Sequence, residues 1–114
     1  MKFGTGTVLS CVTDIMLCDD FVFILEFLTY MTEDDIYTHQ ATRASDVCKP
    51  YLIQQHPWLA ECRAEDITKE NCKEYLAEKI KEHGASLEIQ PLPKGVWTHR
   101  NPVAELVDMM NNKE

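Results

Sequence analysis

A run of apolar residues at 21–31 restricts the fold of this chain more than any other feature. Glu26 and Thr29 are its only strongly polar members, and Asp19 and Asp20 before it can cap a helix N-terminus. A helix that is apolar on nearly every side either lies inside the core or keeps one face for a partner. We expect a core position, and association through this helix, for example as a homodimer, is the alternative.

Two segments predict strands. Residues 5–13 are rich in β-branched types and partly alternate, so we expect an extended segment; a short buried helical turn leading into Ile15 is the alternative. Residues 86–91 alternate more cleanly, with Leu87 and Ile89 on one face, and Pro91 marks the end of the strand. Together the two segments predict a small sheet of two or three strands.

Prolines divide the middle of the chain into short helices. Ser45 can cap a single turn at 46–49. Pro50 fits poorly inside a helix and well at a first helical position, which predicts a second helix at 50–56. The residue before a proline avoids the α region, so Pro57 ends this helix.

Two amphipathic helices follow. Residues 69–83 have one apolar face, and Gly84 is suited to end that helix. Asn101 and Pro102 form a strong helix start. The expected core-facing stripe of this last helix is Val103, Leu106, Val107 and Met110. The sequence therefore predicts a single α+β domain over residues 1–114, with about four helices and a small sheet.

Charge and cysteine usage limit the partners and the compartment. With 11 Lys and Arg against 19 Asp and Glu, the formal net charge is −8, which repels nucleic-acid phosphates and suits a basic protein surface. Because of this charge, we expect no direct nucleic-acid binding. We also expect no membrane span, because no apolar run approaches 18 residues. Five scattered cysteines without a CxxC pair indicate reduced thiols and a cytoplasmic location.

The stretch 37–59, with the acidic turn before it, holds most residues that could carry a function. Three consecutive carboxylates face different directions, so we expect a solvated turn that a partner can contact. Aromatic and imidazole side chains follow on both sides of the predicted short helices. The candidate contact residues are Glu33, Asp34, Asp35, Tyr37, His39 and Trp58.

A metal or thiol site is the competing interpretation of the same stretch. His39, Cys48 and His56 are separated by eight and seven residues, whereas zinc sites are typically built from closely spaced ligand pairs. A cysteine nucleophile at Cys48, beside Lys49, would need a lowered pKa. No motif for a phosphate cradle or a carboxylate pair is evident, and we expect no cofactor.

The pattern Thr38-His39-Gln40, Cys48-x-Pro50-x-Leu52 and Gln55-His56-Pro57 resembles a family of short proteins of unknown function encoded by bacteriophages and prophages. The likeness covers most of the chain. It implies a phage accessory protein that acts in the cytoplasm of a bacterial host, and it implies no activity and no catalytic residue.

These observations favour a non-enzymatic phage accessory protein that binds and inhibits a host protein, for example a defence complex, as anti-CRISPR proteins do. Two alternatives remain. One is a small metal- or thiol-dependent enzyme or sensor that uses His39, Cys48 and His56. The other is an acidic DNA mimic, which requires carboxylates spaced like phosphates along one face. A homodimer is compatible with each.

Overall fold

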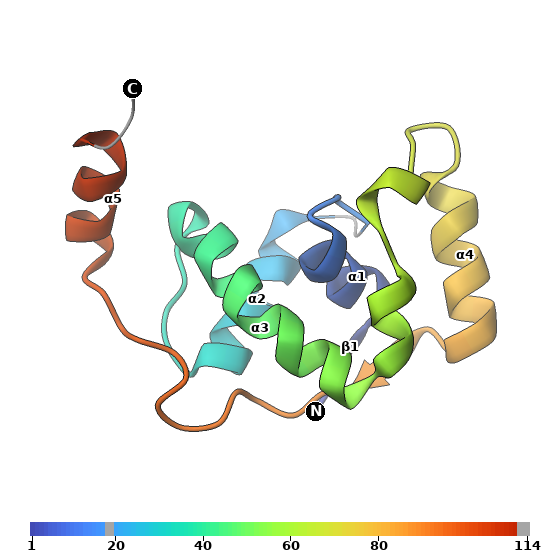
Figure 1. Ribbon diagram of the computed structural model, residues 1–114, viewed down its shortest axis with the longest axis horizontal. Helices are drawn as coiled ribbons and strands as arrows, with labels where there is room; N and C mark the ends of the chain where they lie inside the picture. The colour runs from blue at the N-terminus through green and yellow to red at the C-terminus, as the bar shows by residue number, and fades with distance from the viewer. Residues whose placement is uncertain (18–19, 112–114) are drawn as a thin grey trace.

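The computed structural model describes residues 1–17 and 20–111, which form five α-helices and one two-stranded antiparallel sheet (Figure 1). The α+β class is confirmed, with one helix more than the four expected. The elements are β1 (Lys2–Gly4), α1 (Thr5–Thr13), α2 (Phe21–Thr32), η1 (Thr38–Gln40), α3 (Ala41–Gln55), η2 (Pro57–Glu61), η3 (Ala64–Asp66), α4 (Cys72–His83), β2 (Ser86–Glu88) and α5 (Pro102–Asn111).

Residues 5–13, expected as a strand, form the central helix α1, so that prediction was wrong. The hydroxyls of Ser10 and Thr13 donate to the carbonyl oxygens of Gly6 and Leu9, four residues back, at 2.7 and 2.8 Å. These bonds satisfy the polar side chains within the helix, so a segment rich in Ser and Thr can be buried among α2, α3 and α4. The tertiary surroundings thus override the β preference of the branched residues.

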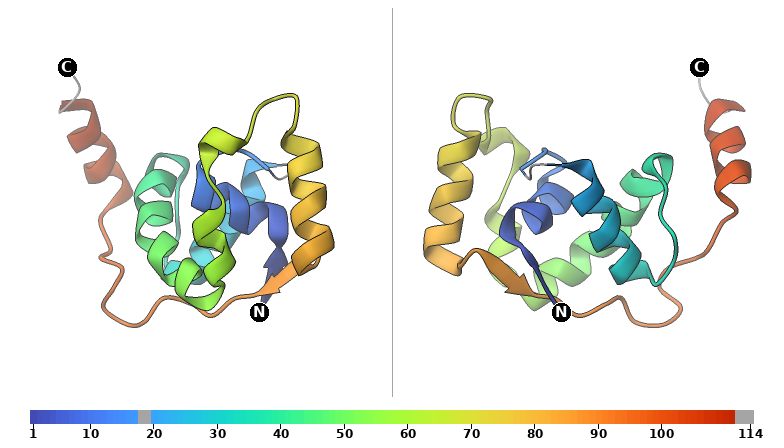
Figure 2. Two further views of the ribbon diagram at one scale, coloured as in Figure 1. Left: turned by 45° about the vertical axis from the view of Figure 1, so that its right-hand side comes forward. Right: turned by 180° about the vertical axis from the view of Figure 1, so that it is seen from behind.

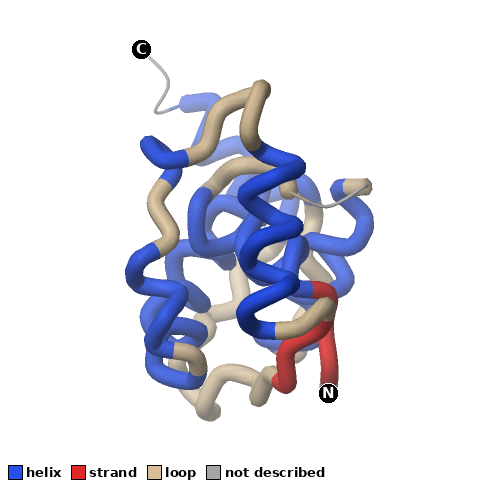
Figure 3. The backbone as a smooth tube through the Cα atoms, turned by 90° about the vertical axis from the view of Figure 1, so that its right-hand side faces the viewer, coloured by secondary structure: helices blue, strands red, loops and turns tan. Residues whose placement is uncertain are grey.

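The strand that pairs with β2 is β1, at residues 2–4. Phe3 lies opposite Leu87 in the antiparallel register, and the two strands run side by side at the edge of the helical body (Figure 3). The strand predicted at 86–91 is confirmed in part, because β2 covers Ser86–Glu88. Leu87 and Ile89 are buried as expected.

Helix α2 supplies much of the core, as predicted. Phe27, Leu28 and Met31 are fully buried. The carboxylate of Asp20 caps the helix by accepting a hydrogen bond from the amide of Val22 at 3.0 Å, whereas Asp19 lies outside the described residues. The outer side of the first turn is apolar as well, because Val22 and Phe23 are each 46% exposed.

Helix α3 is one continuous helix of 15 residues, not the two short helices predicted around Pro50. Ser45 is buried in its middle and does not cap a helix. Pro50 and Asp46 are both exposed, so water can reach the carbonyl oxygen that loses its hydrogen bond to the proline. The buried face at Ala44, Cys48 and Leu52 packs against α1 and α2, which holds the helix together across the proline.

Helix α4 begins at Cys72 rather than residue 69. Before it, the amide of Thr68 donates to the side chain of Asn71 at 2.6 Å, and the amide of Asn71 donates to the hydroxyl of Thr68 at 3.2 Å. This reciprocal pair has the form of a capping box, and the amide of Cys72 donates to the carbonyl oxygen of Thr68 at 2.9 Å, so residues 68–71 form a turn that leads into the helix. The end at Gly84 is confirmed, with φ at +100°.

The start of α5 is confirmed, because Oδ1 of Asn101 accepts hydrogen bonds from the amides of Val103 and Ala104. Its apolar stripe does not face the core, contrary to the prediction. The buried residue of α5 is Glu105, and the stripe points to solvent. No helix within residues 1–17 and 20–111 has both the length and the apolar character needed to cross a membrane.

We predict that Gly6→Ala destabilises the fold by about 1–3 kcal/mol, as overpacking of a core does. A Cβ atom at position 6 would lie 2.3 Å from the carbonyl oxygen of Leu17, a contact that only a backbone shift relieves. This strain outweighs the helical preference for alanine. Urea denaturation measures the change in free energy of unfolding.

Gly4→Ala is the matched control. The nearest atom to a Cβ there is the hydroxyl of Thr7, at an ordinary 3.7 Å, so the expected change is within about 0.5 kcal/mol. Equal stability of the Gly6→Ala variant and the wild type would contradict this account of the α1 packing.

Candidate functional site

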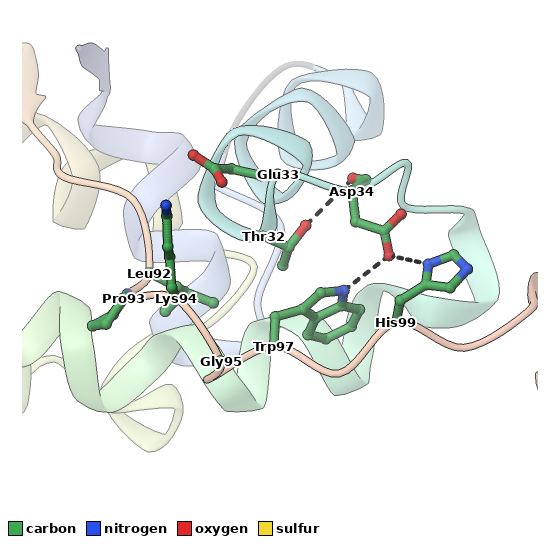
Figure 4. A pocket seen from close by; sticks show the side chains of 9 residues that line it. All are labelled: Thr32, Glu33, Asp34, Leu92, Pro93, Lys94, Gly95, Trp97 and His99. Atoms are coloured by element: carbon green, nitrogen blue, oxygen red, sulfur yellow. Dashed lines mark hydrogen bonds and ion pairs between the residues drawn. The ribbon is translucent and has the colours of Figure 1, made fainter.

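The acidic turn after α2 is built around Asp34. Glu33 ends the helix in the left-handed region, with φ at 55°, and turns the chain. Oδ2 of Asp34 then accepts hydrogen bonds from Nε1 of Trp97 at 2.9 Å and from Nδ1 of His99 at 2.7 Å (Figure 4). Trp97 and His99 come from the loop before α5, so this carboxylate joins two segments that are distant in the sequence.

A pocket of about 450 Å³ lies beside this carboxylate, between the end of α2 and the loop at 92–99 (Figure 4). Glu33 and Lys94 lie at one side of it, and Trp97 and His99 at the other. The hydroxyl of Thr32 donates to the carbonyl oxygens of Leu28 and Asp34. Thr32 is therefore occupied by the backbone, and the pocket offers charged and aromatic groups for binding.

The pKa of Asp34 reflects two opposing effects. Burial raises it, while the hydrogen bonds from Trp97 and His99 and the positive charge of His99 lower it. The lowering prevails, and the pKa lies below the ordinary value of 3.8. Asp34 is thus a carboxylate at neutral pH and stays bound to its two partners.

A second carboxylate, Glu105, lies at the neighbouring end of the loop. Its Oε2 accepts a hydrogen bond from Nε of Arg43 at 2.9 Å, and its Oε1 accepts from Nη2 of Arg43 at 2.8 Å and from Nε2 of Gln40 at 3.1 Å. The Glu105 side chain is 4% exposed. This bidentate contact, reinforced by Gln40, fixes α5 to the start of α3.

Arg43 connects the two carboxylates. Its guanidinium carbon lies 4.0 Å from the centre of the Trp97 ring, and Nη1 donates to the carbonyl oxygen of Thr98 at 3.1 Å. Trp97 in turn binds Asp34. We call the five side chains of this network the C-terminal clamp: Asp34, Gln40, Arg43, Trp97 and Glu105.

Hydrogen bonds from Arg43 lower the pKa of Glu105 below its ordinary value of 4.5. Burial opposes this effect, and the bond from Gln40 and the charges of Arg43 and Arg100 reinforce it. Glu105 is therefore ionised in the folded protein although it is buried, because a cation contacts both of its oxygens.

The residues predicted as partner contacts separate into two places. Glu33 and Asp35 are exposed on the acidic turn, and Tyr37, which is 54% exposed, stacks its ring on His39 with centroids 6.3 Å apart. Trp58 belongs elsewhere. It follows the far end of α3 and stacks on His83 of α4, with ring centroids 3.7 Å apart and nearly parallel.

The alternative metal ligands His39, Cys48 and His56 do not converge. The two histidines flank α3, whose 15 residues span about 22 Å. Nε2 of His39 donates to the carbonyl oxygen of Pro102, and Nε2 of His56 to that of Glu88, each at 2.8 Å. Among residues 1–17 and 20–111, no group of three or more His, Cys, Asp or Glu side chains is placed to hold a metal ion.

Cys48 lacks the surroundings of a nucleophile. The residue is fully buried on the inner face of α3, and burial raises the pKa of its thiol to about 12. A reactive cysteine needs the opposite shift and access to substrate. Of the described cysteines, Cys11, Cys48 and Cys62 are buried, and Cys72 is partly buried.

The side chains of the Thr-His-Gln and Gln-His-Pro motifs mainly form hydrogen bonds to later segments of the chain. Gln55 pairs with the backbone of Gln90 through two hydrogen bonds, at 2.7 and 3.1 Å, much as a neighbouring strand would. His56 holds Glu88, and His39 and Gln40 hold the start of α5. Sequence reasoning missed Gln40, Arg43 and Glu105 as a group; the only signal was a spacing of three residues between Gln40 and Arg43 on one helical face.

The fold and the clamp define a small α+β domain in which polar side chains of the N-terminal half hold α5 and the loop before it. Residues 3–61 match the family described as "Domain of unknown function (DUF7736)". This match covers slightly more than half of the chain, which therefore belongs to that family. No curated protein and no solved structure matches the chain.

The lowered pKa values predict a stability that falls in acid. The interactions of Glu105 and Asp34 contribute fully to the free energy of unfolding above the ordinary pKa values of 4.5 and 3.8. This contribution is lost as the pH falls through the lowered pKa values of the two carboxyls in the folded protein. Glu105→Gln should cost about 2 kcal/mol at neutral pH and flatten this acid dependence. Urea denaturation across a pH series measures both effects.

Asp108→Asn is the matched control, because Asp108 pairs with Arg100 and both side chains are about half exposed. We expect a change within about 0.5 kcal/mol and an unaltered pH profile. An acid dependence equally steep in the Glu105→Gln variant and the wild type would refute the role of Glu105.

Burial of Cys48 also predicts slow alkylation. Iodoacetamide at about pH 8 should leave this thiol unmodified in the folded protein and modify it after denaturation. Cys72 is only partly buried and is the internal control. Mass spectrometry of peptides quantifies both residues, and faster labelling of Cys48 than of Cys72 in the folded state would restore the thiol-enzyme hypothesis.

Proposed function

We propose that this protein is a non-enzymatic phage accessory protein that binds and inhibits a host protein in the bacterial cytoplasm, for example a defence complex. The acidic turn is the observation that carries the proposal. Hydrogen bonds from Trp97 and His99 hold Asp34 inward, so the backbone of the turn is fixed and Glu33 and Asp35 are directed to solvent. A turn ordered in advance loses little conformational entropy on binding.

Charge selects the kind of partner. The net charge of −8 draws the protein toward a basic surface, such as the nucleic-acid-binding face of a host complex. Close contacts then come from the acidic turn and from Tyr37, an exposed aromatic side chain of the type that anchors interfaces. The pocket beside Glu33 and Trp97 is large enough to accept a Lys or Arg side chain of the partner.

The chemistry around the turn supports binding rather than hydrolysis. Asp34 and His99 form a carboxylate–imidazole pair of the kind that orients a general base. The hydroxyl of Thr32 in the same pocket is bonded to backbone carbonyl oxygens, and the Cys48 thiol is buried. The pair therefore has no hydroxyl or thiol to activate among the residues that line this pocket.

DNA mimicry has less support than a binding turn. The carboxylates of α4, at Glu74, Glu78 and Glu82, lie among Lys73, Lys79 and Lys81, and Nζ of Lys79 lies 3.9 Å from the carboxylate of Glu82. Mixed charges of this kind are typical of a solvated helix face. We therefore place the contact surface at the acidic turn.

Reversal of the exposed charges tests the proposal. We expect wild-type protein coupled to beads to capture a stoichiometric protein partner from bacterial lysate at low salt, and the Glu33→Lys/Asp35→Lys variant to bind it at least tenfold more weakly. Salt should weaken wild-type capture, because exposed charges are screened. Quantitative mass spectrometry of the eluted proteins measures both.

Glu74→Lys/Glu78→Lys makes the same change of net charge on α4 and is the control. Retained capture by this variant assigns the effect to the turn rather than to overall charge. Absence of a stoichiometric partner, or equal loss in both variants, would contradict the proposal.

A further inference from the structure

Helix α5 displays an apolar stripe to solvent. Val103 is 70% exposed, Leu106 40%, Val107 47% and Met110 65%. These four residues, which we call the outer stripe, are spaced by three, one and three positions, the pattern with which one helix packs on another. A soluble chain seldom leaves a contiguous apolar row uncovered unless another molecule covers it.

The outer stripe is accessible because α5 meets the body on its other side, at η1 and the start of α3. Both views in Figure 2 show it at the end of a long loop, at the outside of the molecule and far from α4. The residues that tie it to the body lie on its other side and at its start. Glu105 binds Arg43 and Gln40, and the carbonyl oxygen of Pro102 accepts a hydrogen bond from His39. The helix is thus presented in a fixed orientation.

The charges on α5 are already neutralised. Its two charged residues within Pro102–Asn111 are Glu105 and Asp108; Glu105 pairs with Arg43 and Asp108 with Arg100. The chain as a whole carries −8, so two copies repel each other over most of their surface. At α5 this repulsion is weak, and apolar contact can prevail.

Because the charged residues of α5 are paired, the outer stripe suits a partner surface that is apolar and uncharged. A basic partner would need unpaired carboxylates beside it, and both carboxylates of α5 are already paired. A second α5 offers an equally apolar and equally neutral face. We propose that α5 is a dimerisation helix through which two copies of this protein associate, stripe against stripe, about a two-fold axis.

The expected dimer is weak. A helix of ten residues is about 15 Å long, so the contact lies at the low end of specific interfaces and predicts a dissociation constant on the order of 10 μM. The interface leaves the acidic turn of each copy free, which would give a bivalent binder. The inference concerns self-association alone and does not require the proposed host partner.

Sedimentation velocity of the full chain tests the inference over about 1 to 200 μM. We expect a reversible monomer–dimer equilibrium in the wild type. In the Leu106→Asp/Val107→Asp variant, the dissociation constant of the dimer should be at least tenfold larger. Val22→Asp/Phe23→Asp is the control, because these α2 residues are each 46% exposed and apolar. It should dimerise as the wild type does, whereas loss of the dimer in this variant alone would place the interface on α2 and overturn the inference.

A wild type that stays monomeric at every concentration would also overturn it. Circular dichroism establishes that each variant is folded. If the α5 variant does not fold, hydrogen exchange of the wild type at two concentrations decides the question. Slower exchange of amides 102–111 at the higher concentration supports the dimer, and unchanged exchange refutes it.

Discussion

Glu105 is 3% exposed, and both of its carboxylate oxygens bind Arg43, 62 residues earlier in the chain. A buried carboxylate without a cation is strongly unfavourable, so the last segment is stable only where Arg43 can reach it. The Arg43 guanidinium also covers Trp97, and Trp97 donates to Asp34. One ion pair thereby positions α5, the loop before it and the acidic turn together.

The molecule is held in two different ways as a result. Its body is an ordinary apolar core, in which α1, α2 and α3 pack around residues such as Leu9, Phe27 and Leu52. The segment after α4 adds Leu87, Ile89 and Leu92 to that core, and polar contacts such as Gln55 on Gln90 and His56 on Glu88 fix its backbone. Helix α5 is attached by the polar contacts of Glu105 and of the Pro102 carbonyl oxygen. This division leaves the apolar stripe of α5 free, because Glu105 rather than the stripe faces the body.

The same contacts explain the motif that runs through residues 38–57. His39, Gln40, Gln55 and His56 are residue types that catalytic sites use, yet each bonds to a segment beyond residue 61, where the family match ends. Their side chains meet backbone carbonyl oxygens or a paired carboxylate. A motif of this kind maintains the placement of the C-terminal segment, and the acidic turn is the surface that we propose for recognition.

Local signals were sufficient where the cause was local. Asp20 and Asn101 cap helices as their positions predicted, Gly84 ends α4, and the alternation of Leu87 and Ile89 identified a buried strand. The same kind of reasoning was wrong for residues 5–13, because their β-branched types favour a strand and only burial among three helices makes α1 preferable. It was wrong at Pro50 too, since the packing of α3 offsets one lost hydrogen bond.

The sequence by itself determined the α+β class, the helix at 21–32, the caps and the net charge, because these follow from composition and from neighbours within a few residues. Tertiary structure alone decided which side of α5 faces the body and which side chains meet at Asp34 and Glu105. A helical stripe indicates that a face will be covered and does not say by what. Which side of α5 faces the body depends on one ion pair, between Arg43 and Glu105. No local sequence pattern predicts this pair, because its members are 62 residues apart.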